Sequence, residues 1–180
     1  MNPDRDWRQV QQNNPLTKAF IDQVRDVDGV EEVKVKTFMN GKIPKLSMDG
    51  EIWDANIIGL DASYAETLEK GEIQGHVTYE ELEKGDKILM SANMLYWFPE
   101  LKVGDSLKMV LNMGDDQVEK TFEIGAIGDY YASLGGSSFY LPQSVLEKMN
   151  PNNLNYILEI TVNDQKRQCI SGTSGTCRQQ

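Results

Sequence analysis

Apolar residues near the start of the chain recur every three or four positions, which is the spacing of one helix face. Asn14-Pro15 predicts the start of this helix, because Asn can cap it and Pro fits its first turn. Gly29 predicts its end. Apolar and lysine residues then alternate over residues 33–37, which predicts a half-buried strand. The helical stripe consists of Leu16, Phe20, Ile21, Val24 and Val27.

The next part of the chain has a weaker pattern. Asn40-Gly41 and Pro44 predict a break, after which a second strand is expected over residues 52–60. A short helix capped by Asp61 or Ser63 is expected to end at Gly71. Residues 72–84 are acidic and show little periodicity, so we interpret them as a surface loop.

The clearest strand pattern lies between residues 102 and 127. Gly104-Asp105 forms a turn signal, and every second residue of the stretch that follows is apolar. Residues 113–116 turn the chain again, and residues 118–127 return as a second strand. This hairpin indicates a small β-rich body and contains no reactive group.

Short elements surround this hairpin and complete the fold. Residues 88–90 predict a buried strand, residues 91–98 one or two helical turns, and residues 139–141 another strand. Pro142 opens a second amphipathic helix, which a final strand over residues 156–162 follows. We therefore predict an α+β fold with two lobes, in which helix–strand units from both chain ends form one lobe. The β-rich lobe is inserted between them, and this arrangement would place the two termini close together.

The flanks define the expected domain. Residues 1–13 are polar and are expected to form a flexible lead-in, residues 14–166 a domain, and residues 167–180 a disordered tail or cloning remnant. The net charge of −10 argues against a phosphate-binding basic face, so nucleic acid is not an expected partner. The two cysteines, Cys169 and Cys177, are consistent with one local bridge or with two thiols. No apolar run reaches the roughly 18 residues of a membrane helix, which fits either a cytosolic protein or a piece of a longer chain.

Catalytic and ligand-binding motifs are sparse. His76 is the single histidine, and a hydrolase would have to use it, although no nucleophile motif stands nearby. Three Cys and His residues are too few for a structural zinc site, and phosphate-binding glycine motifs are missing. The sequence therefore predicts a protein without catalytic residues, cofactor or metal.

Two aromatic pairs are candidates for partner contacts. Trp97 and Phe98 lie at short helical spacing, where core packing is the more common role and an exposed anchor the alternative. Tyr130 and Tyr131 lie in a loop rich in Gly and Ser, where we expect exposed side chains that contact a partner.

One ordered set of features resembles a known family. Gly75-His76-Val77-Thr78 precedes an acidic spacer, Ile88-Leu89-Met90-Ser91 leads into a short helix, and Leu101-Lys102-Val103-Gly104-Asp105-Ser106-Leu107 follows. Phe139-Tyr140-Leu141-Pro142 then precedes the last helix and strand. This order is similar to the extracytoplasmic (MacB-like periplasmic core) domain of FtsX-like ABC transporter permeases.

The resemblance implies a non-catalytic domain on the extracytoplasmic side of the cell membrane. Such a domain takes part in binding a substrate, lipoprotein, peptide or accessory protein, and in conformational coupling across the membrane. An ABC ATPase subunit would be a partner through the membrane part. The alternative from the residues alone is a soluble protein- or peptide-binding module unrelated to transport.

Overall fold

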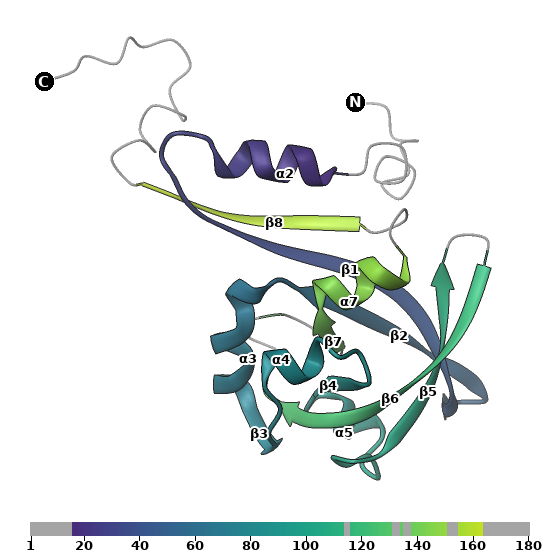
Figure 1. The fold of residues 1–180 in the computed structure, drawn as a ribbon. Coiled ribbons are helices and arrows are strands. Elements are labelled where there is room, and N and C mark those ends of the chain that lie inside the picture. Colours follow the sequence, from purple (N-terminus) through teal and green to yellow (C-terminus); the bar gives the residue numbers. More distant parts are fainter. Residues whose placement is uncertain (1–15, 114–115, 131–133, 135–137, 151–154, 164–180) are drawn as a thin grey trace, which may run out of the picture. The chain divides into compact units, whose positions relative to one another are not determined.

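The computed structural model describes residues 16–113, 116–130, 134, 138–150 and 155–163 (Figure 1). The chain divides into two compact units. One comprises the described parts of Met1–Val35 and Ile157–Gln180, and the other those of Lys36–Tyr156. Helices and strands occur together, which confirms the predicted α+β class. None of the helices in the described ranges is long and apolar enough to span a membrane.

The unit built from the two ends contains helix α2 (Lys18–Arg25). The Thr17 side chain accepts a hydrogen bond from Phe20 N at 3.2 Å and so caps this helix. The predicted cap, Asn14-Pro15, lies outside the described residues. Gly29, with a φ of 93°, lets the chain turn into β1, and its carbonyl accepts a bond from Asn163 N at 2.9 Å. Strand β8 (Asn155–Val162), just before Asn163, neighbours β1 in the sheet.

Strand β1 (Val30–Met48) continues through the positions at which we predicted a break. It pairs antiparallel with β2 (Glu51–Leu60), and the register shifts between Ile43 and Ser47. Pro44 lies within this irregularity, where its missing N–H costs no regular ladder bond. Gly41 pairs with Leu111, and a Cβ at Gly41 would lie 3.0 Å from the Val110 carbonyl oxygen. The predicted break was wrong because Gly and Pro occur in bent, tightly packed strands as well as in turns.

Six strands of the inserted unit form a closed sheet. The order β2–β7–β4–β6–β5–β1 returns to β2 through the β1–β2 pairing (Figure 1). The β2–β7 and β4–β6 pairs are parallel, and the other pairs in this ring are antiparallel. Closure pairs both edges of each strand in the ring, so the ring exposes few unpaired backbone groups. The strands not yet introduced are β4 (Lys87–Ser91), β5 (Ser106–Met113), β6 (Asp116–Gly128) and β7 (Phe139–Pro142).

The predicted hairpin is confirmed as β5 and β6. Gly104 has a φ of 87°, and its N–H donates to the Ile124 carbonyl at 2.8 Å. The Asp105 carboxylate accepts from Lys102 N at 3.1 Å, and the Asp105 carbonyl accepts from Ile124 N at 2.9 Å. The turn thus fastens the start of β5 to β6, and Leu107 is fully buried beyond it.

Buried residues of the strands face two hydrophobic clusters in turn. On β4, Ile88 and Met90 belong to the first core cluster, whereas Leu89 belongs to the second. On β7, Phe139 and Tyr140 are divided in the same way. Because successive side chains of a strand point to opposite faces, both faces of these strands are covered. The second cluster includes residues of the helices η1 (Ala62–Tyr64), α3 (Ala65–Gly71) and α4 (Tyr79–Leu82).

Helix α7 (Gln143–Met149) corrects part of the predicted lobe arrangement. We expected it to form a lobe with the N-terminal helix and strand. It belongs instead to the inserted unit, where Val145 and Leu146 are buried in the first core cluster. Its amphipathic pattern was interpreted correctly, but periodicity identifies a buried face and not the surface that covers it.

Residues 72–84 are not a loop throughout, as we had predicted. They contain strand β3 (Glu72–Gly75), which pairs antiparallel with β6, and helix α4. Thr78 and Glu81 form a capping box at the start of α4, in which Thr78 Oγ1 accepts from Glu81 N at 3.2 Å. The Thr-x-x-Glu spacing was the sequence signal for this helix. A single helical turn was too short for periodicity to reveal it.

Candidate partner-binding site

Four aromatic residues of the inserted unit form an aromatic cluster: Trp53, Tyr96, Trp97 and Phe98. The Trp53 ring lies 5.2 Å from the Phe98 ring, edge to face, and 6.0 Å from the Trp97 ring. Tyr96 and Trp97 meet edge to face at 4.7 Å. Contacts at these distances are favourable beyond the area they bury, so each ring holds its neighbour in place.

Helix α5 (Met94–Trp97) decides which of these rings face outward. Met94 and Phe98 are four positions apart, so they lie on one face and are 0% and 5% exposed. Phe98 N donates to the Met94 carbonyl at 2.9 Å, which closes the turn before Pro99. Tyr96 and Trp97 are 80% and 44% exposed. The predicted pair is therefore divided into Phe98 in the core and Trp97 at the surface.

Trp53 connects the exposed rings to the core. It lies on β2 opposite Ile43 of β1, and it is a partly buried residue packed against the first core cluster. An aromatic surface that rests on fixed side chains loses little conformational freedom when a partner binds. Tyrosine and tryptophan are also the residues that most often dominate binding energy at protein interfaces. The aromatic cluster can therefore act as a preorganised contact surface.

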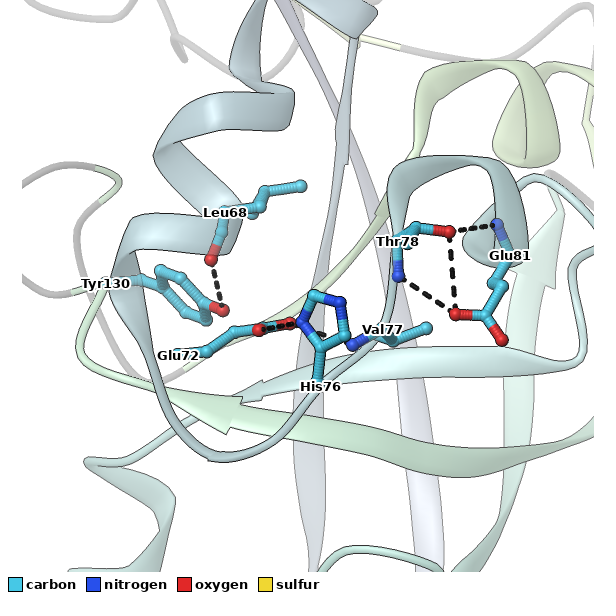
Figure 2. Close-up of polar contacts among 7 residues, drawn as sticks. All are labelled: Leu68, Glu72, His76, Val77, Thr78, Glu81 and Tyr130. Carbon is cyan, nitrogen blue, oxygen red and sulfur yellow. Dashed lines mark hydrogen bonds and ion pairs between the residues drawn. The ribbon is translucent and has the colours of Figure 1, made fainter.

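Tyr130 occupies a different environment from the one we predicted. It is 0% exposed, and its hydroxyl donates to the Leu68 carbonyl at 3.0 Å (Figure 2). Burial raises the pKa of this hydroxyl. The expectation of an exposed contact is wrong for Tyr130, because the ring fills the space beside Gly71 and Gly128. Tyr131 lies outside the described residues.

The two glycines leave the room that the Tyr130 ring needs. A Cβ at Gly71 would lie 2.3 Å from Tyr130 Cε1, and one at Gly128 would lie 2.4 Å from Cζ. The Tyr140 ring packs edge to face against Tyr130 at 5.1 Å. Tyr130 is thus a structural anchor that joins α3, β6 and β7.

His76 forms one end of a polar pair at the exit of β3. Its Nδ1 lies 2.7 Å from Glu72 Oε2, and Glu72 Oε1 accepts from Val77 N at 3.0 Å (Figure 2). The Glu72 side chain is 9% exposed, whereas that of His76 is 67% exposed. The hydrogen bond to Glu72, followed by the charge of Glu72, raises the pKa of His76 above its ordinary 6.5.

This geometry gives the hydrolase alternative no support. A general base must be unprotonated, and the raised pKa favours the protonated imidazole. Nδ1 faces a carboxylate, as in a triad, but no hydroxyl or thiol of a described residue is bonded to the ring. The described residues also contain no group of three or more Asp, Glu, His or Cys side chains that could hold a metal ion. Cys169 and Cys177 lie outside these residues, as do 1–13 and 167–180.

Comparison with known proteins finds solved structures with a similar fold. No family model and no curated protein matches the sequence. The structure is similar to that of the extracellular domain of the noncanonic ABC-type transporter YknZ from Gram-positive bacteria, with a TM-score of 0.53 and 19% identity over 88% of this chain and 81% of that one. It is also similar to the periplasmic region of MacB from Actinobacillus actinomycetemcomitans, with a TM-score of 0.50 and 12% identity over 86% and 82% of the two chains.

These neighbours agree with the family that the ordered motifs resemble. Both are extracytoplasmic regions of ABC transporters, and both match most of the length of this chain. At 19% and 12% identity, the likeness concerns the fold and not the individual side chains. The chain therefore has the fold of the MacB-like extracytoplasmic domains of ABC transporter permeases.

Proposed function

We propose that this chain is the non-catalytic extracytoplasmic domain, over residues 14–166, of an FtsX-like ABC transporter permease. The fold shared with the YknZ and MacB domains is the observation that carries the proposal. An ABC ATPase subunit, coupled through the membrane part of the permease, would supply the energy. The domain itself would contact a substrate, a lipoprotein, a peptide or an accessory protein.

The pairing of the chain ends supports this assignment. Strand β8 neighbours β1, and Asn163 N donates to the Gly29 carbonyl at 2.9 Å. The first and last described elements therefore belong to one unit. A domain inserted between two adjacent membrane helices needs such an arrangement, because its two ends must meet the membrane near each other.

Coupling would use the division of the chain into two units. The chain passes from one unit to the other after Val35, within β1, and again after Tyr156, within β8. Movement of the flanking membrane helices would act first on the unit that holds both ends. We propose that the inserted unit, which contains the aromatic cluster, then changes its position and presents or releases a bound partner.

Topology labelling of the full-length gene product tests the assignment. In a Cys169→Ser, Cys177→Ser background, the exposed Lys102 is replaced by Cys and intact cells are treated with a membrane-impermeant maleimide. We expect the protein in the membrane fraction and equal labelling before and after lysis. Recovery in the soluble fraction, or labelling only after lysis, would contradict the proposal and favour the soluble binding module.

A photo-crosslinking residue tests the aromatic cluster separately. The residue is placed at Tyr96 and, as a control, at the exposed Lys108 of β5, in the full-length protein in cells. We expect one discrete crosslinked product from Tyr96 that is lost when Trp97 is changed to Ser. Equal products from both positions, or a product that does not depend on Trp97, would remove the aromatic cluster as the contact surface.

A further inference from the structure

Strand β3 has one neighbour within the described part of the chain. Glu72 pairs with Gly128 and Gly75 with Ala126, both on β6. The opposite edge of β3 carries no described strand (Figure 1). An edge of this kind presents backbone N–H and C=O groups to which an extended peptide can add as a further strand.

Strand β3 carries an exposed apolar side chain. Ile73 is 61% exposed, and among the large apolar side chains that the structure describes only Tyr96 is more exposed. Gln74 and Gly75 beside it are exposed as well. The register with β6 shifts between Glu72 and Gln74, which places Ile73 at an irregularity of the ladder. An incoming strand would gain a contact with Ile73 in addition to its backbone bonds.

The charge around β3 is strongly negative. Eight carboxylates and three lysines lie between Asp61 and Lys87, so this segment of η1, α3, β3 and α4 carries half of the net charge of −10. Glu69 and Glu80 are exposed. The pKa of His76, at the end of β3, is raised first by Glu72 and then also by Glu69 and Glu81. The negative field therefore extends to this strand.

We propose that the β3 edge is a docking site for a basic, extended peptide segment. The segment adds antiparallel or parallel to β3, places an apolar side chain against Ile73, and directs lysine or arginine side chains to the carboxylates of α3 and α4. Complementary charge selects the partner and speeds its encounter, whereas the backbone pairing fixes its extended form. This site shares no residue with the aromatic cluster and does not depend on whether the chain belongs to a permease.

A short alternating peptide probes the site on the full 180-residue chain. The probe is an acetylated, amidated hexapeptide that alternates Lys and Val, titrated to roughly millimolar concentration, the range of weak binding. Two matched peptides separate the contribution of charge from that of backbone pairing. A Glu–Val hexapeptide reverses the charge. A Lys–Val hexapeptide that is N-methylated at alternate bonds keeps the charge but cannot pair as a strand. Amide NMR shifts locate the binding.

We expect the Lys–Val peptide to perturb the amides of Ile73, Gln74 and Gly75, and both matched peptides to bind at least about ten-fold more weakly. Ile73→Lys should weaken binding by a similar factor. The control, Ile160→Lys, changes an isoleucine that is 46% exposed on β8 and should leave binding unchanged. Equal binding of the methylated or Glu–Val peptide, perturbations centred on Trp97, or no binding would overturn the proposal.

Discussion

Aromatic residues form two regions in the inserted unit, and they have opposite relations to solvent. In the aromatic cluster, rings stack outward from Phe98, which is 5% exposed, to Tyr96, which is 80% exposed. The Tyr130 ring is buried instead, because it lies beside two glycines and packs against the Tyr140 ring. The comparison shows that aromatic content alone does not define a contact surface. The neighbours decide whether a ring supports the fold or remains available to a partner.

Alanine substitutions within the aromatic cluster should separate its inner and outer layers. Phe98→Ala removes a buried ring from the core cluster and should lower the free energy of unfolding by about 3–5 kcal/mol. Tyr96→Ala removes an exposed ring and should change it by less than about 0.5 kcal/mol. Urea denaturation measures both. Similar losses for the two variants would mean that Tyr96 has a structural role.

Gly128→Ala tests the space reserved for Tyr130. The new Cβ would lie 2.4 Å from Tyr130 Cζ and 2.6 Å from the Gly71 carbonyl oxygen, so ring and backbone would both have to shift. We expect a loss of about 1–3 kcal/mol in thermal or urea unfolding. Gly104→Ala is the control for backbone strain, because it has a φ of 87° but no heavy atom within 4 Å of the new Cβ. Gly104→Ala should lower the free energy of unfolding by about 1 kcal/mol. If Gly128→Ala lowers the free energy of unfolding by no more than Gly104→Ala does, the Tyr130 ring does not need the space beside Gly128.

Tyr130→Phe keeps the ring and removes one hydrogen bond. The Leu68 carbonyl would lose a partner at 3.0 Å in a buried environment, so the free energy of unfolding should fall by about 1–2 kcal/mol. Tyr96→Phe makes the same change on an exposed ring and should have no measurable effect. If both variants unfold at the same urea concentration, the buried hydroxyl contributes nothing.

The sequence was informative for several elements that contain their whole pattern. The alternation around Leu107 and the Gly104-Asp105 turn predicted the β5–β6 hairpin, and the Pro142 start predicted α7. Met94 and Phe98, four positions apart, share one side of a helical turn, and both are buried. In each case the signal is local, because helix and strand periods act over a few residues.

Predictions were wrong where distant residues determine the outcome. Tyr130 is buried because Gly71 and Leu68, about sixty positions earlier in the chain, supply its space and its acceptor. Gly41 stays in a strand because it packs against Val110 of another strand. A single sequence does not reveal such pairings, and the closed order of the sheet depends on several of them at once. The aromatic cluster was missed in part for the same reason, since Trp53 joins it from β2.

His76 offers the smallest but most specific test, since its ring gives the single histidine signal of the chain in NMR. Its pKa should lie above the ordinary 6.5, and Glu72→Gln should lower it toward that value by removing the charged acceptor 2.7 Å away. Glu69→Gln keeps the hydrogen bond and should lower the pKa less. Folding favours the protonated ring, so this stabilisation is complete below about pH 6.5 and is lost as the pH rises through the folded pKa. An identical titration curve in Glu72→Gln would mean that the pair between His76 and Glu72 does not form in solution.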